Sequence, residues 1–105
     1  MLRSYIAFDI ETTGLNPAEN EIIEIGALKV REGKVAERFM ELVRPLSPVS
    51  QSITALTGIT NEMLASARSK REVISDFLEF CGDDLLIGHN VSFDYSFVKT
   101  AAAAE

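Results

Sequence analysis

The 105 residues suit one domain, and a chain of this length can bury a core of its own. No apolar run approaches the ~20 residues that a membrane-spanning helix needs, so we expect no membrane partner. The net charge of −6 argues against a tight, autonomous nucleic-acid binder, which would present a basic patch. The negative net charge does not exclude a nuclease, because cations bound by acidic residues would reverse the local electrostatic field.

The first half of the chain predicts three strands. A strand over 4–10 precedes a turn at 16–20, where a proline is flanked by residues that favour loops. A second strand over 21–30 and a third over 35–43 flank a short turn that contains Gly33, which predicts a hairpin. Because the connections are short, we expect the three strands to form an antiparallel meander.

The middle of the chain is rich in residues that bond locally to the backbone. Two prolines end the third strand, and the serines and threonines of 49–60 predict a loop or short turns. Thr60 is placed to cap a short helix over 61–67.

A longer helix follows, with Ser69 and Glu72 in the spacing of a capping box and Gly82 at its end. The apolar run 85–87 predicts a buried strand, and because a helix leads into it, we expect it to lie parallel to the first strand and beside it. A last helix is expected to begin near Val91.

The single cysteine, Cys81, excludes an internal disulfide framework and fits a reducing compartment. It falls in the apolar pattern of the longer helix, so we interpret it as a core residue. The N-terminus lacks the basic and long apolar regions of a signal peptide, and we therefore expect a cytoplasmic protein.

The chemistry of the sequence is concentrated around Asp9 and Glu11. The two residues are two apart on a strand, so their carboxylates point to the same face. Side by side they repel each other, and a hard divalent cation removes that repulsion. Gly14 permits a tight turn directly after them, which can bring backbone N–H groups close to an anionic ligand. The bare spacing is also typical of a solvated strand face.

The longer string Phe8–Leu15 resembles the first motif of the DEDD exonuclease superfamily, the DnaQ-like proofreading nucleases. Glu21–Ala27 is similar to that family's second strand, Leu56–Leu64 to its connecting segment and Gly88–Asp94 to its second motif. These segments span nearly the whole chain in the family's order. The resemblance implies an α/β fold: a ribonuclease H-like mixed sheet of three antiparallel strands and one parallel strand, with flanking helices.

The resemblance also implies 3′→5′ hydrolysis of nucleic-acid phosphodiesters with two Mg2+ or Mn2+ ions. Asp9, Glu11 and Asp94 would be the catalytic metal ligands. The residues expected to bind the 3′-terminal nucleotide are Thr12, Thr13, Gly14, Leu15, Asn90 and Phe93.

Three other residues receive no catalytic role. Glu24 is interpreted as a structural or surface residue. His89 belongs to the second motif, whereas the family's base is a histidine of a third motif. Thr57 stands where the family often carries a histidine, which puts a substrate role for that position in doubt.

The third motif is absent from the sequence, which has one histidine and no further aspartate after Asp94. We therefore expect residues 1–105 to be the N-terminal part of one exonuclease domain, C-terminally incomplete, with little or no activity alone. The patterns are most similar to bacterial replicative proofreading domains, such as the epsilon subunit of DNA polymerase III. The expected partners are a single-stranded 3′ end, with DNA favoured, and a polymerase subunit or fused domain. The alternative is a non-catalytic module that binds a polymerase or a nucleic acid.

Overall fold

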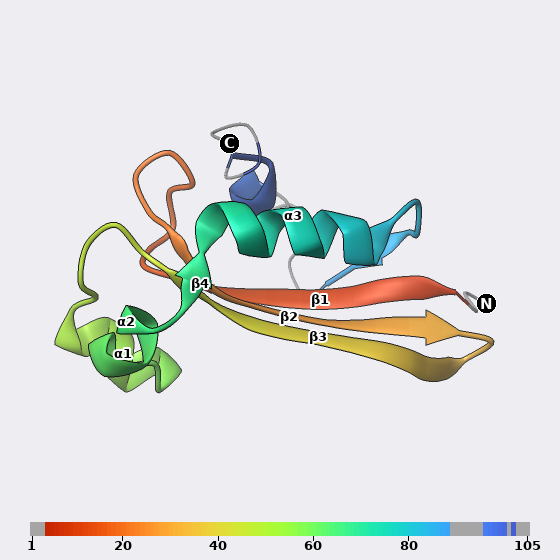
Figure 1. Ribbon diagram of the computed structural model, residues 1–105, viewed down its shortest axis with the longest axis horizontal. Coiled ribbons are helices and arrows are strands. Elements are labelled where there is room, and N and C mark those ends of the chain that lie inside the picture. Colours follow the sequence, from red (N-terminus) through yellow and green to blue (C-terminus); the bar gives the residue numbers. More distant parts are fainter. Residues whose placement is uncertain (1–3, 89–95, 101, 103–105) are drawn as a thin grey trace.

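The computed structural model describes residues 4–88, 96–100 and 102 (Figure 1). One five-stranded sheet runs in the order β4-β3-β2-β1-β5. The strands are β1 (Tyr5–Thr12), β2 (Ile22–Arg31), β3 (Lys34–Arg44), β4 (Arg68–Ser69) and β5 (Leu86–Ile87). The antiparallel meander of β1, β2 and β3 and the parallel pairing of β5 with β1 are both confirmed.

The β2–β3 hairpin closes in a two-residue turn. Glu32 and Gly33 have φ values of 54° and 75°, so both lie in the left-handed region. This backbone matches the right-handed twist of the two flanking strands, which is why tight hairpins use it.

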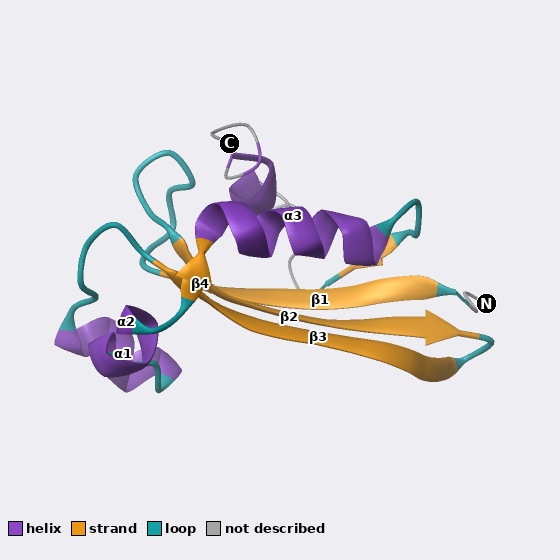
Figure 2. Ribbon diagram, viewed as in Figure 1, coloured by secondary structure: helices purple, strands orange, loops and turns teal. Residues whose placement is uncertain are grey.

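The helices are α1 (Gln51–Thr57), α2 (Asn61–Ala65) and α3 (Lys70–Cys81). Figure 1 shows α3 lying along one side of the sheet, whereas α1 and α2 lie together at one end of it. The loop 13–21 projects from that same end, as the loops of Figure 2 show. That end of the sheet is the one at which β1 finishes.

The main core lies between the sheet and α3. Phe77 of α3 is 1% exposed, and its ring centroid lies 5.8 Å from that of Phe8 and 5.7 Å from that of Phe39. Cys81 is buried in the same core, as predicted. Burial raises the pKa of its thiol to about 11, which keeps the group protonated.

A second, smaller core holds α1 and α2 against the other face of the sheet. A bulge interrupts the β1–β2 ladder after Glu11, where Thr12 pairs with Ile22. As a result Ile22 enters the main core, and its neighbour Ile23 enters the small core with Leu64 of α2. Because each face of the sheet is covered by a core at this point, both of these consecutive isoleucines are buried.

One prediction about local structure is wrong. Residues 49–60 were expected to form a loop or short turns, but α1 occupies 51–57: the Ser50 hydroxyl accepts a hydrogen bond at its N-terminus, and Gly58 ends it with φ 80°. The structure also adds a fifth strand to the predicted mixed sheet: β4 is only two residues long and pairs parallel with β3. The capping roles of Thr60 and Ser69 are confirmed.

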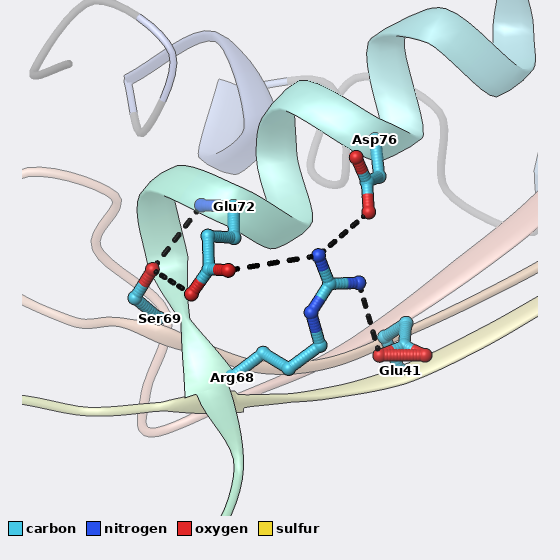
Figure 3. A network of polar contacts seen from close by, with 5 residues as sticks. All are labelled: Glu41, Arg68, Ser69, Glu72 and Asp76. Atoms are coloured by element: carbon cyan, nitrogen blue, oxygen red, sulfur yellow. Dashed lines mark hydrogen bonds and ion pairs between the residues drawn. The ribbon is translucent and has the colours of Figure 1, made fainter.

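Arg68 of β4 joins the sheet to the start of α3 (Figure 3). Its guanidinium lies 2.8 Å from a carboxylate oxygen of Asp76, 3.5 Å from one of Glu41 and 3.9 Å from one of Glu72. Ser69 caps α3 by accepting a hydrogen bond from the Glu72 N–H. The contacts link β3, β4 and α3, although each ion pair is at the surface and is worth little alone.

The described C-terminal residues 96–100 are helical, and Phe97 and Val98 are buried in the main core. The predicted start of that helix, near Val91, lies outside the described residues. Within the described part of the chain, no helix is both long and apolar enough to cross a membrane.

Phe77→Ala is expected to lower the free energy of unfolding by ~3–5 kcal/mol, because it removes the ring on which Phe8 and Phe39 pack. Urea denaturation measures the change. The adjacent Leu78, which is 48% exposed, is the matched control, and Leu78→Ala should lower stability by less than about 1 kcal/mol. Equal losses in the two variants would contradict this placement of the core.

Candidate active site

Asp9 and Glu11 share the face of β1 that turns away from α3. Ile6, Phe8 and Ile10 alternate with them and are buried in the main core. Asp9 is exposed and Glu11 is partly buried. The alternation of the strand therefore brings the two carboxylates together on the open face, as the sequence predicted.

Glu24 joins this pair from the neighbouring strand. It is the cross-strand partner of Glu11, so the two side chains lie on the same face, and it is partly buried. From the sequence, Glu24 was interpreted as a structural or surface residue without a metal role. Only the register of β1 against β2 could have revealed the pairing, and no local pattern fixes that register.

The three carboxylates are electrostatically coupled. Burial is the main cause that raises the pKa of Glu11, and the charges of Asp9 and Glu24 raise it further. The pKa of Glu24 is likewise raised, first by burial and then by Asp9. Glu11 and Glu24 thus ionise less readily than free carboxyl groups do, because burial and neighbouring negative charge both disfavour the charged form.

The donor set fits a hard divalent cation. No lysine or arginine of the described chain forms an ion pair with Asp9, Glu11 or Glu24. Asp9 accepts one hydrogen bond through Oδ1, from the Ile10 N–H at 3.0 Å. Uncompensated carboxylate oxygens on a rigid strand are the ligands that Mg2+ and Mn2+ prefer. Within the described residues, no group of three acidic, histidine or cysteine side chains completes a metal site.

Gly88 is the last described residue before the segment that holds the other predicted site residues. Asn90, Phe93 and Asp94, like His89, lie outside the described residues. The described chain leads toward the site, because β5 pairs with β1 and Gly88 lines the same groove as Asp9. This groove, of about 620 Å³, follows the open face of the sheet and is mostly apolar; it is lined in part by Ala7, Asp9, Gly26, Leu28, Met40 and Gly88.

The loop after β1 is closed by paired hydrogen bonds. The Thr13 N–H donates to the Glu21 carbonyl, and the Glu21 N–H donates to the Thr13 hydroxyl oxygen, both at 2.9 Å. The Thr12 hydroxyl donates to the Gly14 carbonyl at 2.6 Å. Thr13 thus uses its N–H and hydroxyl inside the chain, whereas the exposed Leu15 side chain reaches solvent.

The structure gives a steric reason for glycine at position 14. Glycines 33, 58 and 82 of the described chain have positive φ, but Gly14 does not. Instead, a Cβ at position 14 would lie only 2.6 Å from side-chain atoms of Asn20. The glycine is needed for the close approach of Asn20 and not for a left-handed turn.

Thr57 has a structural role. Its hydroxyl donates to the Ile53 carbonyl at 2.8 Å and accepts from the Ile59 N–H at 3.1 Å. These bonds secure the end of α1 and the turn after it. They account for a threonine at this position without any contact to a substrate.

A model of the exonuclease family RNase_T matches residues 6–104. Among curated relatives, the DNA polymerase III PolC-type proteins of Latilactobacillus sakei and Bacillus subtilis are 49% identical over 95 residues and 45% identical over 98 residues. These matches cover 90% and 93% of this chain but only 7% of each relative.

Solved structures agree with the family match. Exonuclease X in complex with 5′ overhanging duplex DNA matches with a TM-score of 0.75 and 32% identity, over 89% of this chain and 52% of that one. E. coli Exonuclease I in complex with a dA16 oligonucleotide matches with a TM-score of 0.83 over 97% of this chain and 24% of that one. Its 18% identity supports the fold alone.

The chain belongs to the exonuclease family, and its ribonuclease H-like α/β fold is confirmed. The expected likeness to the exonuclease part of a bacterial DNA polymerase III is also confirmed, with the refinement that these relatives are of the PolC type and are not epsilon subunits. The chain spans a small part of their length.

Glu24→Gln is expected to stabilise the metal-free chain near neutral pH. Because the pKa of Glu24 is raised above its ordinary value of 4.5, the folded chain holds this proton more tightly than the unfolded chain does. Stability is therefore lost as the pH rises through the folded-state pKa, and the substitution removes that loss.

Urea midpoints in EDTA at about pH 7.5 and about pH 4 measure the effect, which should be present at the higher pH and absent at the lower. Glu79→Gln, on the exposed surface of α3, is the control for a general change of charge. An advantage that is larger at low pH would refute the coupling.

Proposed function

We propose that this protein is a metal-dependent 3′→5′ exonuclease module that acts on DNA. The observation that carries the proposal is a pair of carboxylates on the open face of β1, Asp9 and Glu11, which have no ion-pair partner among the described residues. A pure binding module has no need of a repulsive pair at the end of a rigid strand, whereas a nuclease needs oxygen ligands at that place.

The proposed cofactors are two Mg2+ or Mn2+ ions. When bound, such ions lower the pKa of a water molecule and neutralise charge on the phosphate and the departing oxygen. We assign Asp9, Glu11 and Asp94 to hold them. The strand fixes the two carboxylates of β1 before metal arrives, so little conformational freedom is lost on binding.

The reaction is hydrolysis of the last phosphodiester of a strand. Oxygen from water forms a bond to phosphorus, and the bond between phosphorus and the 3′ oxygen of the preceding nucleotide breaks. That oxygen takes up a proton, so the products are a nucleoside 5′-monophosphate and a strand shortened by one nucleotide. The base that accepts the proton from water belongs to the family's third motif, which these residues do not contain.

The loop after β1 is proposed to bind the terminal nucleotide. The assigned residues are Thr12, Thr13, Gly14 and Leu15, with Asn90 and Phe93 from the second motif. Support comes from the loop's position directly after Glu11 and from the 83% exposure of the Leu15 side chain. An exposed leucine can wedge against a base, and exposed backbone N–H groups can donate to a phosphate.

DNA is the preferred substrate because the named relatives are DNA polymerases and because both solved exonucleases above were determined with DNA. We propose that residues 1–105 belong to one exonuclease domain that works beside a polymerase in proofreading. We place the protein in the cytoplasm.

Titration of the chain with Mn2+ in a calorimeter is expected to show binding that Asp9→Ala abolishes, because this substitution removes a carboxylate of the pair. Asp83→Asn, in the exposed turn after α3, is the matched control and should bind like the wild type.

The same variants test for recognition of a 3′ end. Fluorescence anisotropy should show Mn2+-dependent binding of single-stranded DNA with a free 3′ hydroxyl, and weaker binding when that hydroxyl carries a phosphate. DNA binding that depends neither on Mn2+ nor on Asp9 would instead favour a non-catalytic module. Absence of Mn2+ binding in the wild type would rule out the proposed site.

A further inference from the structure

The geometry of the loop 13–21 points to Asn20 as a positioning residue: we propose that its side chain sets the position of the Gly14–Leu15 backbone, which receives the terminal nucleotide. The inference rests on the proposed function and deepens it. It assigns a role in substrate binding to a residue that lies in none of the motifs quoted above.

The first support is the close packing of Asn20 on Gly14. A Cβ added at position 14 would lie 2.6 Å from Cγ, from Oδ1 and from Nδ2 of Asn20. The whole carboxamide therefore lies against the Gly14 backbone. A Cβ at that distance would clash, so this packing of Asn20 against the backbone requires glycine at position 14.

The second support is a set of hydrogen bonds that fixes Asn20 itself. Its Oδ1 accepts from the Asn16 N–H at 3.0 Å, and its own N–H donates to the Asn16 carbonyl at 2.8 Å. The Asn16 Oδ1 in turn accepts from the Ala18 N–H at 2.9 Å. Turn residues that bond to nearby backbone in this way hold a loop in one conformation.

The third support is that the base of the loop is anchored independently. Thr13 and Glu21 close it through two hydrogen bonds, and both carboxylate oxygens of Glu21 lie 3.0 Å from the Leu46 nitrogen. With the base of the loop and Asn20 both fixed, the Gly14 backbone packs against a side chain that is itself held in place.

Gly14 and Leu15 offer what an anionic ligand needs. Among the described residues, neither N–H has a hydrogen-bond acceptor. Two consecutive donors held by a packed side chain are suited to the phosphate or sugar oxygens of a nucleotide. Asn20 thus acts through the backbone and needs no contact with the nucleotide itself.

The test is an NMR titration of the 15N-labelled chain with thymidine 5′-monophosphate in the presence of Mg2+. In the wild type, the amide signals of Gly14 and Leu15 should shift and saturate together. In Asn20→Ala the dissociation constant should rise by about fivefold, the effect of losing one well-placed hydrogen bond.

A double-mutant cycle tests the packing directly. Gly14→Ala should weaken nucleotide binding in the wild-type background, because the new Cβ displaces the loop. It should have a smaller effect in the Asn20→Ala background, where the obstructing carboxamide is gone. Additive effects would show that the two residues do not act through their contact, and would refute the inference.

Asn61→Ala is the matched control for a loss of loop hydrogen bonds. The Asn61 carboxamide makes two hydrogen bonds to the Val49 backbone. Its Oδ1 accepts from the Val49 N–H at 2.7 Å, and its Nδ2 donates to the Val49 carbonyl at 3.0 Å. This variant should lower the urea midpoint and leave the dissociation constant within about twofold of the wild type. If it weakens nucleotide binding as much as Asn20→Ala does, the effect is general loosening and the inference fails.

The outcomes separate the two proposals. Equal affinity in wild type and Asn20→Ala contradicts the role of Asn20 and leaves the proposed function intact. No shift in the wild type contradicts both. If Asn20→Ala gives no dispersed spectrum, Asn20→Ser takes its place, because it keeps an acceptor oxygen and removes the carboxamide that packs on Gly14.

Discussion

The antiparallel pairing of β1 with β2 determines both the core and the candidate site. Its register sets Phe8 opposite Ala27 on the side of α3, and Glu11 opposite Glu24 on the open side. A slip of one residue would turn the carboxylates toward the core and the aromatic ring toward water. The register is therefore held by burial of one face, and the acidic face follows from it.

The core that stabilises the protein and the carboxylates of the candidate site lie on opposite sides of the sheet. On one side of the sheet, Phe77 packs against the rings of Phe8 in β1 and Phe39 in β3. Arg68 joins β3, β4 and α3 through three carboxylates. On the other side, the raised pKa values of Glu11 and Glu24 indicate that the acidic groups oppose folding when no cation is bound. A stable scaffold thus carries a site whose charges are unfavourable alone, which is common for groups selected for function.

Much of the fold could be predicted from sequence, because turn residues separate the strands of the meander and the capping box of α3 is local. The helix α1 was missed because its serines were read as loop formers, although Ser50 and Gly58 cap it at both ends. The two-residue strand β4 exists only through its pairing with β3 and leaves no pattern of its own. In the site, the alternation of β1 predicted the shared face of its carboxylates. The position of Glu24 beside Glu11 depends on the register between β1 and β2. The packing of Asn20 on Gly14 depends on how the loop 13–21 folds back on itself. Neither can be predicted from a local sequence pattern.

The central claim is that the open face of β1 is a divalent-cation site. The most direct measurement is anomalous X-ray diffraction from crystals soaked in Mn2+, compared between the wild type and Asp9→Ala. The account predicts anomalous density in contact with the carboxylates of Asp9 and Glu11, and its loss in the variant. Anomalous density that appears elsewhere, or that remains beside β1 after Asp9 is replaced, would contradict it.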